Sequence, residues 1–193
     1  RDDLVTGVQT CALPISGLAA GEGAWGDYDG DGDLDLALIG ETVEDGECRR
    51  IARIYRNDFG FLEEDTAQSD RLVGVYYGDL GWADYDGDGD LDLAIAGWDE
   101  RGAESLLLYR NDSADDGSRL LTLDLEQSLS LDGGEDTAEL KGVRYARLAW
   151  ADYDGDGDWD LAVAGMDKFG LSLTRLYRNQ DGLFALDSLN ERA

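Results

Sequence analysis

The chain has no histidine and only two cysteines among its 193 residues. Serine and cysteine hydrolases use an imidazole to activate their nucleophile, so these enzyme classes are excluded within this stretch of chain. Cys11 lies near the N-terminus and Cys48 lies in a Glu-rich stretch. Because Cys48 has no imidazole to activate it, we interpret it as an incidental loop residue rather than a catalytic thiol.

Basic residues and long apolar runs are also scarce. Only 16 Lys and Arg stand against 44 Asp and Glu, which gives a net charge of −28. Like charges repel, so nucleic acids and anionic membrane surfaces are unfavourable partners. No apolar run approaches the ~20 residues that cross a bilayer, which predicts no membrane insertion.

The single proline lies within residues 1–16. The run from Val5 to Ile15 reads like the translation of a sequencing-adapter oligonucleotide and has no counterpart in the rest of the chain. We therefore predict that residues 1–16 are a non-native, adapter-derived segment and exclude them from fold reasoning. On this interpretation the remainder is a piece of a longer protein, and its lack of a signal peptide carries no information about secretion.

Aspartate, in contrast, is abundant, and much of it belongs to one loop sequence that occurs three times. The sequence Asp-Tyr-Asp-Gly-Asp-Gly-Asp-Leu-Asp-Leu begins at Asp27, recurs at Asp84, and recurs at Asp152 with Trp159 in place of its first Leu. Side chains at positions 1, 3, 5 and 9, a main-chain carbonyl at position 7 and a Gly at position 6 suit an oxygen cage for a hard cation. The residues at positions 1, 3, 5, 7 and 9 are Asp27, Asp29, Asp31, Asp33 and Asp35; Asp84, Asp86, Asp88, Asp90 and Asp92; and Asp152, Asp154, Asp156, Asp158 and Asp160.

Calcium suits such a cage better than magnesium, because it accepts many oxygen ligands in a flexible geometry. The same spacing opens an EF-hand loop, which also needs a bidentate Glu at position 12 and a helix on each side. Position 12 is Leu38, Ile95 or Val163, and each loop leads into a short apolar run that ends at Gly. Such runs are typical of a strand packed between two layers, so we predict three calcium sites in loops between strands.

The repeat extends beyond the loop. A Trp stands two residues before each loop, and a Tyr-Arg-Asn run follows it (Trp25, Trp82, Trp150; Tyr55, Tyr109, Tyr177). Because these aromatic residues recur at equivalent positions, we predict that they pack in the core. The loops recur after 57 and then 68 residues, and each unit holds about four short strands. This period predicts β-propeller blades, at about 17–79, 80–147 and 148–193.

The Trp-x-Asp-Tyr-Asp-Gly-Asp-Gly-Asp-Leu-Asp-Leu motif, followed by the Leu-Tyr-Arg-Asn strand, resembles the FG-GAP or VCBS-type repeat of integrin-like β-propellers. The resemblance covers roughly residues 17–193. It implies an all-β fold in which these four-stranded antiparallel blades form an incomplete arc of a propeller of about seven blades. It also implies calcium in the loop between the first two strands of each blade, held by the Asp residues named above. Three blades cannot close a ring, so further blades are expected elsewhere.

Two functions remain open at this point. In the first, the chain is a non-catalytic, calcium-binding module of a secreted or cell-surface protein that recognises or adheres to glycan or protein partners. In the second, it is an accessory propeller portion of a secreted polysaccharide-degrading enzyme. We expect no catalytic residues here, because the aspartates with a clear spatial arrangement are already assigned to the cages. Binding is expected on loops that differ between blades, at Glu41–Arg50, Trp98–Glu104 and Asp112–Glu139, and Trp98 is a candidate sugar-stacking ring.

Overall fold

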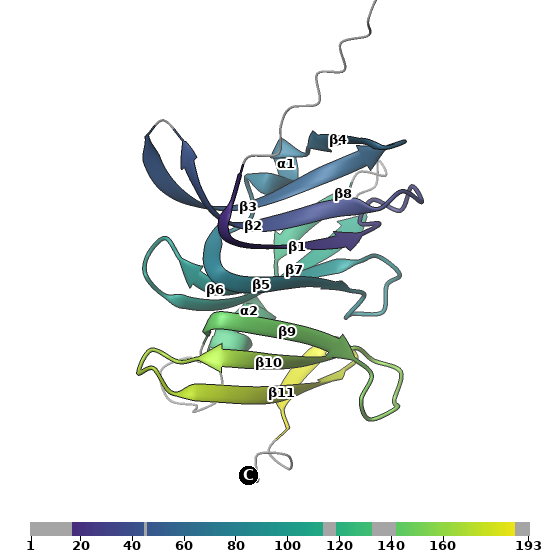
Figure 1. Ribbon diagram of the computed structural model, residues 1–193. Helices are drawn as coiled ribbons and strands as arrows, with labels where there is room; N and C mark the ends of the chain where they lie inside the picture. The colour runs from purple at the N-terminus through teal and green to yellow at the C-terminus, as the bar shows by residue number, and fades with distance from the viewer. Residues whose placement is uncertain (1–16, 45, 114–118, 133–141, 188–193) are drawn as a thin grey trace, which may run out of the picture.

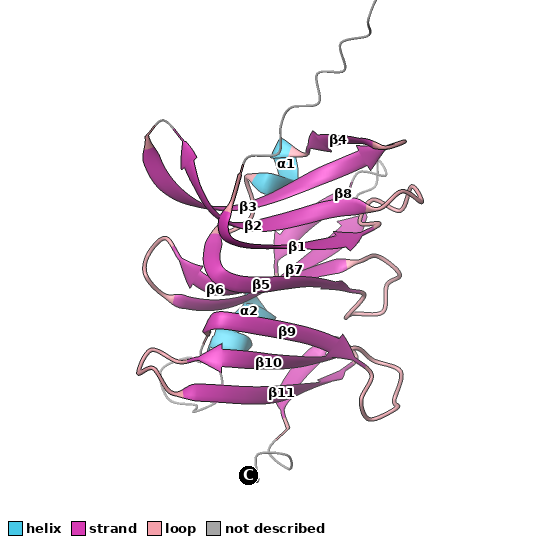
Figure 2. Ribbon diagram, in the orientation of Figure 1, coloured by secondary structure: helices cyan, strands magenta, loops and turns pink. Residues whose placement is uncertain are grey.

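The computed structural model describes residues 17–44, 46–113, 119–132 and 142–187. These residues form three four-stranded antiparallel sheets that lie one above the other in Figure 1, and Figure 2 shows how strongly strands predominate over helices. The first sheet contains β1 (Ala19–Gly26), β2 (Asp35–Glu44), β3 (Glu47–Asp58) and β4 (Phe61–Glu64). The second contains β5 (Val75–Ala83), β6 (Asp92–Asp99), β7 (Glu104–Ser113) and β8 (Arg119–Leu123). The third contains β9 (Arg144–Ala151), β10 (Asp160–Met166), β11 (Ser172–Gln180) and β12 (Leu183–Leu186).

Every sheet pairs its strands in sequence order, as a meander. The all-β architecture and the four-stranded, blade-like unit are therefore confirmed. The predicted boundaries at 79/80 and 147/148 fall inside β5 and β9, so the chain changes sheet earlier than the sequence pattern indicated. Both strands carry a β-bulge near their start, where their register with the next strand shifts.

The core consists of two layers of apolar side chains, one on each side of the middle sheet. Leu93 and Ile95 of β6 belong to the layer shared with the first sheet, whereas Ala94 and Ala96 belong to the layer shared with the third. Successive strand residues point to opposite faces, so a strand buried on both sides reads as a continuous apolar run. The runs after the Asp loops are thus explained by burial between sheets, as predicted.

Two of the three repeated Trp residues hold neighbouring sheets together. The indole Nε1 of Trp82 in β5 donates to the main-chain oxygen of Ala24 in β1 at 3.3 Å, and that of Trp150 in β9 donates to Gly81 in β5 at 3.3 Å. Both rings also pack against the core layers. Their predicted packing role is confirmed, as is that of Tyr55, Tyr109 and Tyr177, which are buried. Trp25, with no described sheet beside it on that face, is 56% exposed.

Two short helices follow the last strands of the first two sheets, α1 (Thr66–Ser69) and α2 (Leu125–Asp132). In the part of the chain that the structure describes, neither helix is long and apolar enough to span a membrane. The three Asp loops lie at one end of the sheets, opposite the β2–β3, β6–β7 and β10–β11 hairpins (Figure 1).

Candidate metal centre

Each Asp loop is shaped by its own carboxylates and by two glycines. Gly30 and Gly32 have φ angles of 75° and 97°, in a region that residues with a Cβ rarely adopt. Asp27 Oδ2 accepts a hydrogen bond from the Gly32 amide at 3.1 Å, and Asp29 Oδ1 accepts one from the Asp31 amide at 3.2 Å. The second and third loops repeat both bonds. The loop sequence therefore folds back around its own side chains.

The folded loops bring together the carboxylates at positions 1, 3 and 9. In every loop one oxygen from each of these three residues lies within 4.8 Å of the other two (Asp27, Asp29 and Asp35; Asp84, Asp86 and Asp92; Asp152, Asp154 and Asp160). The position 5 aspartates, Asp31, Asp88 and Asp156, are not part of these three groups. In the second loop Asp88 instead forms a separate group with Asp86 and with Asp112 at the end of β7.

The position 7 aspartates use their side chains differently from the other four. Asp33 Oδ2 accepts a hydrogen bond from the Phe59 amide at 2.9 Å, and Asp158 Oδ2 accepts one from the Asp181 amide at 2.7 Å. In the second loop, Asp90 pairs with Arg119. The predicted role of this position, a main-chain oxygen ligand, leaves the side chain free to anchor the loop to the end of the sheet.

The position 9 carboxylate is the buried centre of each loop. Asp35 Oδ2 accepts from the Tyr28 amide at 3.0 Å and Oδ1 accepts from the Asn57 amide at 2.8 Å. Asp92 is held in the same way. Burial raises the pKa of Asp35 to about 6 and that of Asp92 to about 7. A carboxylate with two fixed N–H donors still has lone pairs to offer, and a bound cation would favour its charged form.

The loops also connect to the rest of the sheet through residues whose role the sequence analysis missed. The hydroxyl of the position 2 tyrosine donates to an aspartate that follows the last strand of its sheet. The pairs are Tyr28 and Asp65 (2.7 Å), Tyr85 and Asp124 (2.9 Å), and Tyr153 and Asp187 (2.6 Å). Asp65 also caps α1 by accepting from the Gln68 amide at 3.1 Å. The recurrence of Asp-x-x-Gln-Ser at 65–69 and 124–128 was the available signal.

A second missed residue is the asparagine of the Leu-Tyr-Arg-Asn run. The Asn111 side-chain amide donates to the Leu91 oxygen of its own loop at 3.0 Å and to the Tyr28 oxygen of the preceding loop at 2.8 Å. Asn179 does the same with Trp159 and with Tyr85. These buried amides therefore fasten each Asp loop to the one before it.

Comparison with protein families agrees with this geometry. The family model described as "FG-GAP-like repeat" matches residues 27–95, from the first Asp loop to the strand after the second. The chain contains an FG-GAP-like repeat. No curated protein matches it. The match supports the FG-GAP-like repeat that the Asp loops and their flanks indicated.

The residues of the FG-GAP-like repeat fit a hard divalent cation. The donor set consists of carboxylate and main-chain oxygens, which calcium prefers. In the first loop Asp27 Oδ1 is buried and has no hydrogen-bond partner, so an acceptor stands unsatisfied among clustered carboxylates. Asp27, Asp29 and Asp35 would hold the ion there, with the position 5 side chain and the position 7 carbonyl as the remaining predicted ligands. The second and third loops offer the same three positions.

Proposed function

We propose that the chain is a calcium-binding β-propeller module of a secreted or cell-surface protein, and that it recognises glycan or protein partners without catalysis. The observation that carries the proposal is the recurrence of the same group of three carboxylates in three sheets. Clustered carboxylates repel one another, and burial raises the pKa of Asp35, Asp92, Asp29 and Asp86. A calcium ion in each loop would remove that repulsion.

The role of the ion in this proposal is structural. The Asp loop connects the first two strands of a sheet, and its tyrosine and neighbouring asparagine connect it to the last strand and to the next sheet. An ion that fixes the loop therefore fixes how neighbouring sheets pack. Calcium sites in extracellular modules are weak, with dissociation constants of about 10⁻⁴–10⁻³ M. Such sites fill only where calcium is abundant, outside the cytoplasm, which supports the proposed location.

We also propose that further blades pack against these three sheets. Trp82 and Trp150 each cover the sheet that precedes them, whereas the equivalent Trp25 is 56% exposed. Leu171, just before β11, and Leu183 of β12 are exposed as well. We infer that these exposed apolar side chains belong to faces that meet a partner. Another blade on each side would bury these residues in the way that Trp82 is buried.

Titration calorimetry on the whole chain tests the metal sites. We expect three calcium ions in the wild type, two in Asp29→Ala, and three in the control Asp33→Asn, because Asp33 is proposed to bind through its main-chain oxygen. Retention of three ions in Asp29→Ala would contradict the assignment. A glycan and protein array, read with and without calcium, tests recognition, and a turnover screen on bound polysaccharides tests the absence of catalysis. Sugar cleavage abolished by an Asp variant that keeps its fold and its metal would favour an enzyme.

A further inference from the structure

The first strand of every sheet carries a β-bulge at the same place. The register shifts between Ala19 and Glu22 in β1 and between Tyr76 and Asp79 in β5, and β9 has an equivalent shift. Each bulge places one residue in the left-handed region, Ala20 at φ 47°, Tyr77 at φ 47° and Tyr145 at φ 53°. Such a conformation is a genuine outlier for a bulky side chain and costs about 1–2 kcal/mol. Strain that is retained at equivalent positions points to a function.

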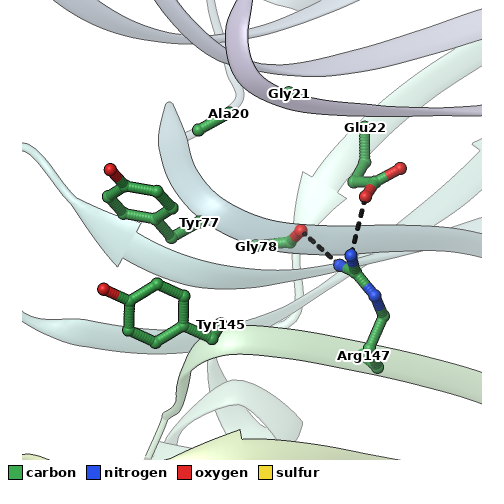
Figure 3. Close-up of a pocket in the computed structure, with 7 residues that line it drawn as sticks. All are labelled: Ala20, Gly21, Glu22, Tyr77, Gly78, Tyr145 and Arg147. Carbon is green, nitrogen blue, oxygen red and sulfur yellow. Dashed lines mark hydrogen bonds and ion pairs between the residues drawn. The ribbon is translucent and has the colours of Figure 1, made fainter.

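The two strained tyrosines are not used to fill the core. Tyr77 is 41% exposed and Tyr145 is 54% exposed, and their ring centroids lie 4.9 Å apart at an interplanar angle of 42°. Figure 3 shows the rings side by side, with both hydroxyls directed the same way and Ala20 of the first sheet above them. The bulges thus direct two aromatic rings from neighbouring sheets onto one exposed surface.

Tyr77 also belongs to a row of packed aromatic rings formed with Tyr76 and Trp98. The ring centroids of Tyr77 and Tyr76 lie 4.5 Å apart, and those of Tyr76 and Trp98 lie 5.5 Å apart at an interplanar angle of 17°. The guanidinium of Arg50 lies 4.2 Å from the centre of the Tyr76 ring. Trp98, the sugar-stacking candidate of the sequence analysis, is therefore packed within the row, and Tyr77 and Tyr145 present the open rings.

A polar wall completes the pocket beside the two rings. The Arg147 guanidinium pairs with Glu22 at 2.9 Å and donates to the Gly78 oxygen at 3.3 Å, as Figure 3 shows. Gly78 could not be replaced, since a Cβ there would meet the Ala96 oxygen at 2.1 Å. The pocket has a volume of about 230 Å³, below the ~300–1,000 Å³ of sites for drug-sized ligands. It is suited to one ring rather than to an extended peptide.

We propose that this tyrosine pocket (Ala20, Glu22, Tyr77, Tyr145 and Arg147) binds one neutral sugar residue of a glycan. The C–H face of a sugar ring is apolar and suits an aromatic surface, while its hydroxyls can donate to the Glu22 carboxylate. A neutral ligand is favoured because Arg147 is already paired with Glu22 and the chain carries a net charge of −28. The inference rests on the proposed recognition function and supplies its ligand class and its site.

Glycine substitutions at the bulges test the proposal without unfolding the protein. Glycine adopts positive φ readily, so Tyr77→Gly and Tyr145→Gly remove a ring while relieving strain. Phe59→Gly is the matched control, because Phe59 is an exposed ring at φ 54° that lies outside the pocket, so the change removes a ring and relieves strain elsewhere. With calcium present, each protein is titrated with maltotriose, cellotriose, xylotriose, mannotriose and trigalacturonate, and binding is followed by saturation-transfer NMR.

We expect the wild type and Phe59→Gly to bind at least one neutral trisaccharide with equal affinity. Each tyrosine variant should bind it about tenfold more weakly or not at all, with a Tm no lower than that of the wild type. The proposal is overturned if no neutral trisaccharide binds, if trigalacturonate binds more tightly, or if the affinity for a bound trisaccharide is the same in both tyrosine variants as in the wild type. In any of these cases, the proposed function still holds if the chain binds calcium or if it binds a protein on the array.

Discussion

The asparagine that fastens one Asp loop to the next gives a sharp test of how neighbouring sheets are coupled. Asn111 is fully buried, and its side-chain amide donates to Leu91 in its own sheet and to Tyr28 in the preceding sheet. The side chain of Asn57, the equivalent residue of the first sheet, donates to the Leu34 oxygen and accepts from the Gly60 amide, each at 2.9 Å, in an exposed place and within its own sheet. Asn111→Ala and Asn57→Ala therefore make the same chemical change with and without a contact between sheets.

The expected loss of stability depends on whether the main-chain oxygens that lose the Asn donor can find another donor. A net hydrogen bond is worth about 1 kcal/mol, and a buried acceptor left without a donor costs more. Asn111→Ala should thus lower the free energy of unfolding by about 2–3 kcal/mol. Asn57→Ala should lower it by less than about 1 kcal/mol, since water replaces the lost partner. For a chain of this size the larger value corresponds to a Tm about 4–12 °C lower.

Urea denaturation in excess calcium measures both changes. Circular dichroism follows the strands and tryptophan fluorescence follows the packed Trp82 and Trp150, so coincident curves establish a single transition. Equal losses for Asn111→Ala and Asn57→Ala would refute the reasoning, because the contact between sheets would then contribute nothing. A changed slope with urea would show that Asn111→Ala detaches a sheet before the rest unfolds.

Three further outcomes are expected. Chelation should lower the Tm, and calcium should restore it better than magnesium, because saturation at one hundred times the dissociation constant stabilises by about 2.7 kcal/mol per site; equal restoration would argue against the cage. Gly74→Ala should lower the free energy of unfolding by about 1–3 kcal/mol, because the added Cβ would lie 2.1 Å from the Arg50 oxygen. Gly17→Ala, whose Cβ would meet nothing within 4 Å, should leave the free energy of unfolding unchanged, and urea denaturation measures both. Burial alone would raise the pKa of Asp99, but the Ala103 amide and Arg101 hold that pKa below the usual value for an aspartate. The difference in stability between wild type and Asp99→Asn should therefore persist above the usual aspartate pKa and shrink as the pH falls through the lowered pKa. A pH-independent difference in urea titrations would contradict this assignment.

The parts of the structure that the sequence predicted are those set by local spacing. The Asp loop, its glycines and the apolar run after it are contiguous, so the loop and its strand could be read together. The packing of Trp82 and Trp150 followed from repetition at equivalent positions, because identical units stacked in a row bury the same residue each time.

The parts that escaped prediction depend on contacts between segments far apart in the chain. Asn179 and Tyr85 are 94 residues apart, and neither residue type signals such a bond on its own. The bulges escaped for another reason. A positive φ at Tyr77 contradicts the intrinsic preference of tyrosine, so no local sequence pattern signals it. Position 5 of the Asp loop was assigned as a ligand from its spacing and stays a prediction, and the carboxylates that cluster in the structure are those at positions 1, 3 and 9.

The path from loop to helix has a consequence for how the sheets respond to force. Tyr28 in the first Asp loop bonds Asp65, which caps α1, and Gln68 of α1 accepts from the Leu121 amide in the second sheet at 2.9 Å. Gln127 of α2 accepts from Phe184 of the third sheet at 3.2 Å in the same manner. A pull on one sheet is therefore carried to its neighbour through a series of directed hydrogen bonds that ends at an Asp loop. If the Asp loops bind calcium as proposed, we expect such an array to yield one unit at a time, with a mechanical strength that rises and falls with the supply of the ion.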